Sequence, residues 1–251
     1  MNNYMAVVEY DGTNYSGFQI QPGGTNTIQG KLIEVLSKIL NEKIDLKYAG
    51  RTDAGVHAKH QVISFRTSKD LDIYRILWSV NSLLPDDIVI KEMRKASPSF
   101  DARKDAALRE YNYFVVNKKY HSVFLKKYSI LITGKLNVRL MRKAARMFLG
   151  VKDFASFCNS ECLSSNTVRK IFRFTVEKTK DDLIIFKVAA NSFLYNMVRI
   201  IVGTVLEIGR GQRELSSIRE AFTKRDRNLA GEIVPAKGLF LTRVEYFSRL
   251  E

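Results

Sequence analysis

The stretch Ala49-Gly50-Arg51-Thr52-Asp53-Ala54-Gly55-Val56-His57-Ala58 is the part of the chain around which the rest is organised. An apolar run at 62–65 follows it and predicts a strand. Glycine permits turns with positive φ and lets a backbone or a ligand approach closely. The stretch therefore predicts a loop that holds Asp53 at the mouth of a sheet, next to the fixed cation Arg51. The alternative is an Asx turn, in which Asp53 caps its own backbone and Arg51 is solvated.

The charge of the chain predicts a polyanionic partner. The 251 residues carry 41 Lys and Arg against 26 Asp and Glu, a net charge of +15. Nucleic acid is favoured over a membrane, because no basic amphipathic helix stands out. Residues 1–103 carry 13 cations against 12 acids, and residues 104–251 carry 28 against 14. We therefore expect most phosphate contacts from the second half. A generally lysine-rich surface is the alternative.

Other features narrow the class of protein. No signal peptide begins the sequence, and the most apolar segment, 193–208, is interrupted by Asn196, Arg199 and Glu207. The pair Cys158 and Cys162 makes a poor zinc site and offers no disulfide framework. A cytoplasmic protein without a membrane span is therefore expected.

Motifs for bound cofactors are missing from the sequence. It contains no phosphate loop and no dinucleotide fingerprint. His57 and His60 have no clustered acids beside them and are weak metal ligands. The expectation is a reaction on a polyanion that uses neither a cofactor nor a metal.

Strands and helices are expected to interleave without βαβ repetition, which favours an α+β fold with a mixed or antiparallel sheet. The linker 97–103 divides the chain into expected halves 1–103, which carries the Asp53 loop, and 104–251, which is strongly basic. Strands are expected at 4–10, 46–48, 60–66, 87–93, 109–116, 168–178, 183–190 and 238–247. Helices are expected from a cap at Thr27 to 40, at 69–83, from a cap at Asn137 to about 150, at 193–208 and near 214–223.

The strand at 109–116 has an unusual face. Alternation places Arg109, Tyr111 and Tyr113 on one side. An arginine beside two tyrosines suits a platform on which bases stack, and a cross-strand aromatic cluster is the equally simple alternative. In the apolar segment 193–208, Arg199 must reach a polar end or find a carboxylate, because an unpaired buried guanidinium is too costly.

Seven short strings occur along the chain in this order: Tyr10-Asp11-Gly12-Thr13, Gly17-Phe18-Gln19, Ala49 to His57, Phe100-Asp101-Ala102-Arg103, Arg109-x-Tyr111-x-Tyr113, Asn196-Met197-Val198-Arg199-x-x-Val202-Gly203 and Pro235-Ala236-x-Gly238-Leu239. Taken together, these strings closely resemble the tRNA pseudouridine synthase A family over nearly the whole chain. The resemblance implies the pseudouridine synthase fold, with two ferredoxin-like halves whose sheets join across a basic cleft. It also implies a homodimer that grips tRNA and acts on uridines 38 to 40 of the anticodon stem-loop.

The resemblance assigns roles residue by residue. Asp53 matches the catalytic aspartate, Tyr111 the tyrosine that contacts the substrate, and Arg199 the arginine near the catalytic acid. Arg51 matches the arginine thought to assist base flipping. Three positions depart from the usual pattern, and they put the choice of uridines in question: Asp101, where His is frequent, Glu110, where Arg is common, and Phe18, where Trp is frequent.

These residue types suit the implied reaction, in which the C1′–N1 bond of uridine breaks and the ring rejoins through C5. A carboxylate can attack C1′ or C6, or take a sugar proton, and the sequence leaves these routes open. Arg199 is the expected partner that keeps Asp53 ionised in a dry pocket. Flipping the base out costs a few kcal/mol. Stacking on Tyr111 returns about 1–3 kcal/mol.

Three alternatives remain open on the sequence alone. A non-catalytic RNA-binding protein explains the charge and the aromatic strand, but not a carboxylate in a glycine-framed loop, because carboxylates repel phosphate. An enzyme acting on small phosphorylated metabolites is the second alternative, and the same chemistry on another structured RNA is the third.

Overall fold

The computed structural model describes residues 1–159 and 165–247 and divides into two compact units. Unit 1 holds residues 1–109 and the described residues from 240 onward, and unit 2 holds residues 110–239. The chain passes between the units twice, at Arg109/Glu110 and at Leu239/Phe240. The boundary expected after residue 103 thus lies just ahead of the first passage, and the C-terminal strand belongs mostly to unit 1. Cys162, the second cysteine of the sequence, lies outside the described residues.

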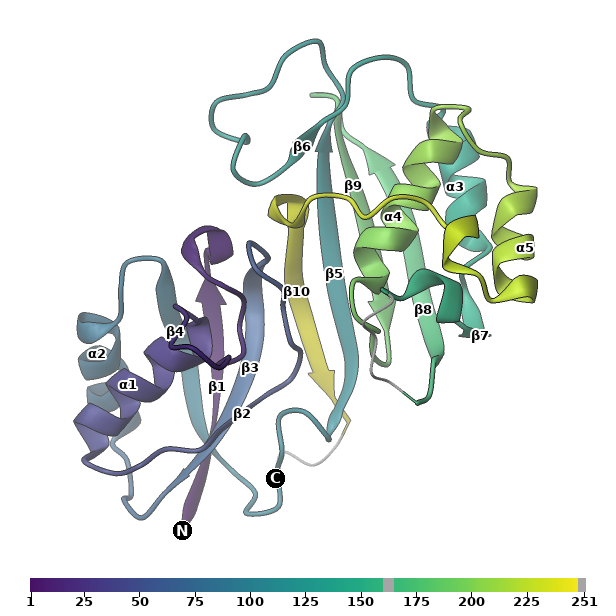
Figure 1. Ribbon diagram of the computed structural model, residues 1–251. Helices are drawn as coiled ribbons and strands as arrows, with labels where there is room; N and C mark the ends of the chain where they lie inside the picture. Colours follow the sequence, from purple (N-terminus) through teal and green to yellow (C-terminus); the bar gives the residue numbers. More distant parts are fainter. Residues whose placement is uncertain (160–164, 248–251) are drawn as a thin grey trace. The chain divides into compact units, whose positions relative to one another are not determined.

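Unit 1 contains a sheet with the strand order β4-β1-β3-β10, and β2 pairs with β3. Strands β1, β3 and β4 pair antiparallel, whereas β10 runs parallel to β3. Helix α1 contacts α2, and α2 packs along β4 (Figure 1). The elements are β1 (Asn2–Tyr10), α1 (Ile28–Leu40), β2 (Leu46–Tyr48), β3 (His57–Thr67), α2 (Ile73–Leu83), β4 (Ile88–Ala96) and β10 (Leu239–Tyr246).

Local side chains set the ends of both helices in unit 1. The Thr27 hydroxyl accepts from the Gly30 amide and begins α1, as expected, and Asn41 ends it in the left-handed conformation with φ 51°. Helix α2 was expected to begin near Lys69, but it begins at Ile73. The reason is that the Asp72 carboxylate accepts from the Arg75 amide and is the N-cap.

Unit 2 contains a sheet with the strand order β5-β9-β8-β7, and the short β6 runs parallel to β5. The hairpin of β8 and β9 is antiparallel, with Val176 opposite Phe186. Helix α3 packs on β8 and on α4, and α5 contacts the short 3₁₀ turn at Ala155–Phe157 (Figure 1). The elements are β5 (Ala106–Val116), β6 (Ile130–Leu131), α3 (Val138–Arg146), β7 (Gly150–Asp153), β8 (Val168–Lys178), β9 (Leu183–Ala190), α4 (Met197–Gly209) and α5 (Ser216–Lys224).

Two expectations about unit 2 were wrong in detail. Helix α4 begins at Met197 rather than Phe193. The reason is that Asn196 adopts the left-handed conformation with φ 59°, which a right-handed helix running through this residue would not allow. Helix α3 ends at Arg146, and the chain then turns at Gly150, with φ 91°, into β7, a strand that the sequence did not predict.

The α+β fold class is confirmed, since helices accompany strands that pair in both parallel and antiparallel fashion. Within the part of the chain that the structure describes, no helix is both long enough and apolar enough to cross a membrane.

Candidate active site

The Asp53 loop is held by a side chain of the strand that follows it. Gln61 on β3 is fully buried, and its amide pairs with both polar groups of Gly50. Gln61 Nε2 donates to the Gly50 carbonyl at 2.6 Å, and Gln61 Oε1 accepts from the Gly50 amide at 3.2 Å. This two-point contact fixes the backbone three residues ahead of Asp53.

A second set of contacts holds the loop from the segment after β1. The hydroxyls of Tyr10 and Thr52 lie 2.7 Å apart, and the Phe18 amide donates to the Thr52 carbonyl at 3.0 Å. Gly17 has φ 98°, and a Cβ there would lie 2.9 Å from the Thr52 carbonyl oxygen. Only glycine allows this approach, so Gly17 is needed for the segment to pack directly against the backbone of the Asp53 loop.

Asp53 itself is half-buried in a tight turn. The Val56 amide donates to the Asp53 main-chain oxygen at 3.1 Å, and Gly55 has φ 74°. Arg51 lies on the same loop with its side chain exposed to solvent. The structure therefore brings these two predicted residues together on one rigid backbone segment.

Arg109 is a residue whose role the sequence did not reveal. It is buried, and its guanidinium donates twice to the Ala49 carbonyl, at 2.9 and 3.1 Å. It also donates to the main-chain oxygens of Ala106 and Arg103, each at 2.7 Å. Arg109 thus binds the first residue of the loop stretch rather than serving as part of a base-stacking platform.

His57, at the start of β3, also has a structural position. It is 1% exposed, its Nδ1 lies 3.1 Å from the Gly12 amide nitrogen, and its ring stacks on Phe240. In residues 1–159 and 165–247, no cluster of three His, Cys, Asp or Glu side chains is placed to hold a metal ion.

Tyr111 lies in unit 2 and is only 7% exposed. Its ring meets Phe193 edge to face, with the centroids 5.3 Å apart. Tyr113, on the same strand face, is fully buried, and its hydroxyl donates to the Pro235 carbonyl at 2.8 Å. Burial also raises the pKa of Tyr113 far above its usual value. Tyr113 therefore cannot belong to a stacking platform, because its ring is buried and its hydroxyl is bonded to the main chain.

Arg199 is half-buried on α4, in the same unit as Tyr111. Its Nε donates to the Val234 carbonyl at 2.7 Å, and its NH1 donates to Asn196 Oδ1 at 2.9 Å. These two acceptors explain how an apolar helix carries a guanidinium. They also fix the direction in which the charged group lies.

The three positions that depart from the family pattern all have partners within their own units. Phe18 is buried against Tyr48, with the ring centroids 4.7 Å apart. Asp101 caps a turn by accepting from the amides of residues 103 and 104 at 2.8 and 3.0 Å. Glu110 is buried and pairs with Arg173 on β8.

The excess of positive charge is concentrated in unit 2. Residues 110–239 carry 24 Lys and Arg against 11 Asp and Glu, whereas the rest of the chain carries 17 against 15. Unit 1 therefore contains a rigidly held carboxylate. Unit 2, described by itself, contains an oriented guanidinium, an aromatic ring and an excess of cations that attract a polyanion. A carboxylate held in this way can act as a nucleophile or a base.

Comparison with known proteins identifies relatives over nearly the whole chain. A family model for tRNA pseudouridine synthase matches residues 6–103 and 144–247. A tRNA pseudouridine synthase A from Geobacillus sp. strain WCH70 is 45% identical over 95% of this chain and 96% of its own. Relatives of the same name from Thermoanaerobacter sp. strain X514 and Brevibacillus brevis are 39% and 40% identical, each over 98% of this chain and 100% of theirs.

Solved structures resemble the chain more distantly. An H/ACA ribonucleoprotein bound to a substrate RNA containing 2′-deoxyuridine aligns with a TM-score of 0.39 and 12% identity, over 81% of this chain and 44% of that one. A likeness at this level supports no conclusion about function.

Proposed function

The chain belongs to the tRNA pseudouridine synthase family, and we propose that it modifies uridines 38 to 40 of the anticodon stem-loop with Asp53 as the catalytic residue. Its reaction is the isomerisation of uridine to pseudouridine in tRNA. The C1′–N1 bond breaks, a C1′–C5 bond forms, C5 loses its proton and N1 gains one, so no cofactor is needed. The observation that carries the assignment to Asp53 is its loop, which Gln61 and Gly17 hold against the sheet.

Unit 2 supports the roles proposed for Arg199 and Tyr111. Val234 and Asn196 already hold the Arg199 side chain in one orientation. Binding a carboxylate therefore costs little further side-chain conformational entropy. In our proposal it keeps Asp53 ionised, and Tyr111 contacts the flipped uracil. Phe193 holds the Tyr111 ring edge to face and so preorganises it for that contact.

Arg51 is proposed to bind the phosphates that flank the flipped nucleotide, since its exposed guanidinium lies on the same loop as Asp53. In our proposal the half 1–103 carries the catalytic loop, and the half 104–251 binds RNA and completes the site. The surplus of positive charge in the second half supports this role. The enzyme is proposed to be a cytoplasmic homodimer, which would have twice the 28.8 kDa mass of one chain.

The catalytic proposal is tested with unmodified tRNA transcripts labelled with tritium at C5 of uridine. Wild-type protein should release tritium, because C5 loses its proton. Asp53→Asn should abolish release and keep the Kd for tRNA within about threefold, since the substitution removes no phosphate contact. Asp45→Asn is the matched control, because Asp45 is an exposed acid of the same unit, and it should react like wild type. Normal release by Asp53→Asn would contradict the assignment.

The position of modification is tested separately. Transcripts in which the uridines at 38 to 40 are replaced by cytidine should yield no pseudouridine when the products are mapped by sequence. Pseudouridine at other positions would contradict the anticodon assignment and leave the isomerase activity standing.

A further inference from the structure

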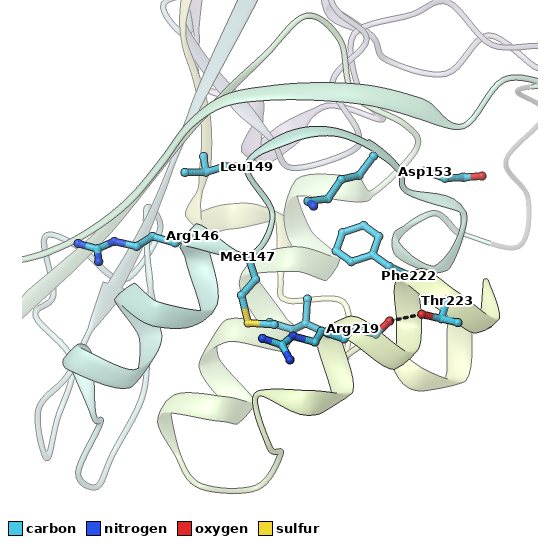
Figure 2. A pocket seen from close by; sticks show the side chains of 9 residues that line it. Arg146, Met147, Leu149, Asp153, Arg219, Phe222 and Thr223 are labelled. Carbon is cyan, nitrogen blue, oxygen red and sulfur yellow. Dashed lines mark hydrogen bonds between the residues drawn. The ribbon is translucent and has the colours of Figure 1, made fainter.

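A groove of about 670 Å³ opens in unit 2, away from the residues discussed so far. It lies between the end of α3, strand β7 and helix α5 (Figure 2). Its lining includes Arg146, Lys152 and Arg219, together with the apolar side chains of Leu149 and Phe222. Its size falls within the range of pockets that hold small organic ligands.

The cations of the groove are available to a ligand. Arg146 and Arg219 are exposed, and within residues 1–159 and 165–247 neither of them, nor Lys152, takes part in an ion pair. The one acid in the lining, Asp153, is already engaged: Oδ1 accepts from the Ala155 amide at 3.1 Å, and Oδ2 pairs with Arg225. In Figure 2 its carboxylate points away from Phe222. The groove therefore presents an excess of positive charge.

Phe222 gives the groove a rigid aromatic wall. Its ring packs against Phe154 and Phe157, with centroid distances of 5.4 and 5.0 Å, and remains half-buried rather than enclosed. Lys152 Nζ lies 5.4 Å from the centroid of the same ring. An aromatic surface bordered by cations is the arrangement that binds an unstacked base together with its phosphate.

The surrounding sequence favours a nucleic acid strand over a small anion. Residues 111–152 contain ten Lys and Arg and no Asp or Glu, and Arg146 and Lys152 come from this segment. One free nucleotide offers a single phosphate group to the three cations that line the groove, whereas a strand offers a phosphate on each side of the bound nucleotide. The groove is also separate from Tyr111. Tyr111 lies on β5, and β7, which borders the groove, is three strands away, so the two strands are about 14 Å apart at the usual spacing.

We propose that this groove is a second RNA-binding site, which takes one nucleotide of the substrate RNA away from the uridine being modified. Arg146 and Arg219 bind phosphate oxygens, and Phe222 contacts the base. This inference rests on the proposed function, because it takes tRNA as the ligand. The groove contributes to affinity and not to the chemical step, so its loss raises KM and leaves kcat unchanged.

The test measures the Kd for unmodified tRNA at several salt concentrations. The double variant Arg146→Ala/Arg219→Ala should bind more weakly, and its slope of log K against log salt should be shallower by about 1.4 to 1.8, because two phosphate contacts are lost. The matched control is Lys143→Ala/Lys224→Ala, which removes two exposed cations from the same two helices outside the groove and should give a smaller change. Equal slopes for the two double variants would overturn the proposal.

Two further measurements complete the test. Phe222→Leu, which keeps most of the apolar packing, should weaken binding about fivefold without changing the salt slope. Adenosine monophosphate is the probe for a free nucleotide. If it binds wild type but not the Arg146→Ala/Arg219→Ala protein, while tRNA binding is the same in both, the groove takes free nucleotides and the RNA proposal is wrong. The two proposals can also fail separately. If the double variants change the salt slope of tRNA binding as predicted but wild type forms no pseudouridine, the proposed function fails and the groove proposal stands.

Discussion

Replacing Gln61 with methionine tests whether the loop contacts position Asp53 for catalysis. Methionine has a similar volume but cannot form the two hydrogen bonds to Gly50. The substitution leaves the Gly50 amide and carbonyl without their partner, at about 1–3 kcal/mol each, so the free energy of unfolding should fall by about 2–6 kcal/mol. Because the freed backbone lies three residues from Asp53, a shift of about 1 Å there should lower kcat about 100-fold.

The chain offers a matched control for this experiment. Asn81 makes the same two-point contact with the backbone of Ile90, donating to the carbonyl at 2.9 Å and accepting from the amide at 2.8 Å. That contact joins α2 to β4, away from the Asp53 loop. Asn81→Leu should therefore lose a similar free energy of unfolding and keep the kcat of wild type.

Urea unfolding followed by circular dichroism gives the stability of both variants, and tritium release from saturating tRNA gives kcat. If Gln61→Met loses stability to the same extent as Asn81→Leu and retains the wild-type kcat, the contact stabilises the fold without positioning the acid. The catalytic part of the reasoning is then refuted. If Gln61→Met unfolds like wild type, the hydrogen-bond reasoning itself is refuted.

Three further predictions concern stability. Gly17→Ala should lower the free energy of unfolding in urea by about 1–3 kcal/mol, because φ is 98° and the new Cβ would meet the Thr52 carbonyl at 2.9 Å. Tyr113→Phe should cost about 1 kcal/mol in the same assay, because the bond to the Pro235 carbonyl is lost. Hydrogen bonds and ion pairing hold the pKa of Asp153 below its usual value. Its carboxylate therefore stabilises the fold above about pH 4. The advantage of wild type over Asp153→Asn should be constant above about pH 5 and decline as the pH falls, in urea titrations at each pH.

Elements with a local signal in the sequence were predicted well. The caps of α1 and α3 at Thr27 and Asn137 are confirmed, and so is the β8–β9 hairpin around the turn at 180–182. Each depends on residues within a few positions of one another, which a sequence displays directly. Strand β7 was missed because Gly150–Asp153 is short and pairs only with the distant residues 168–171.

The buried contacts of the candidate site could not be predicted, because they join residues that are far apart in the sequence. Nothing near Arg109 shows that its guanidinium binds the Ala49 carbonyl, and its tyrosine neighbours suggested a stacking surface instead. Gln61 likewise is a polar residue inside an apolar run, and its partner Gly50 is eleven residues earlier. A polar side chain in a strand can face solvent or satisfy a buried backbone group, and only the tertiary structure distinguishes these.

Three of the separate strings that resembled the family have one physical explanation within unit 1. The string at 10–13 places the Tyr10 hydroxyl against Thr52, and the glycine at 17 lets its segment contact the same backbone. The first residue of the string 109–113 then secures Ala49, at the start of the loop stretch. Each string is distant from the others in sequence, yet all three end on the ten residues that carry Asp53. The simplest purpose for so many constraints on a half-buried turn is to hold one carboxylate still. For that reason the loss of any of them should reduce kcat more than it weakens tRNA binding.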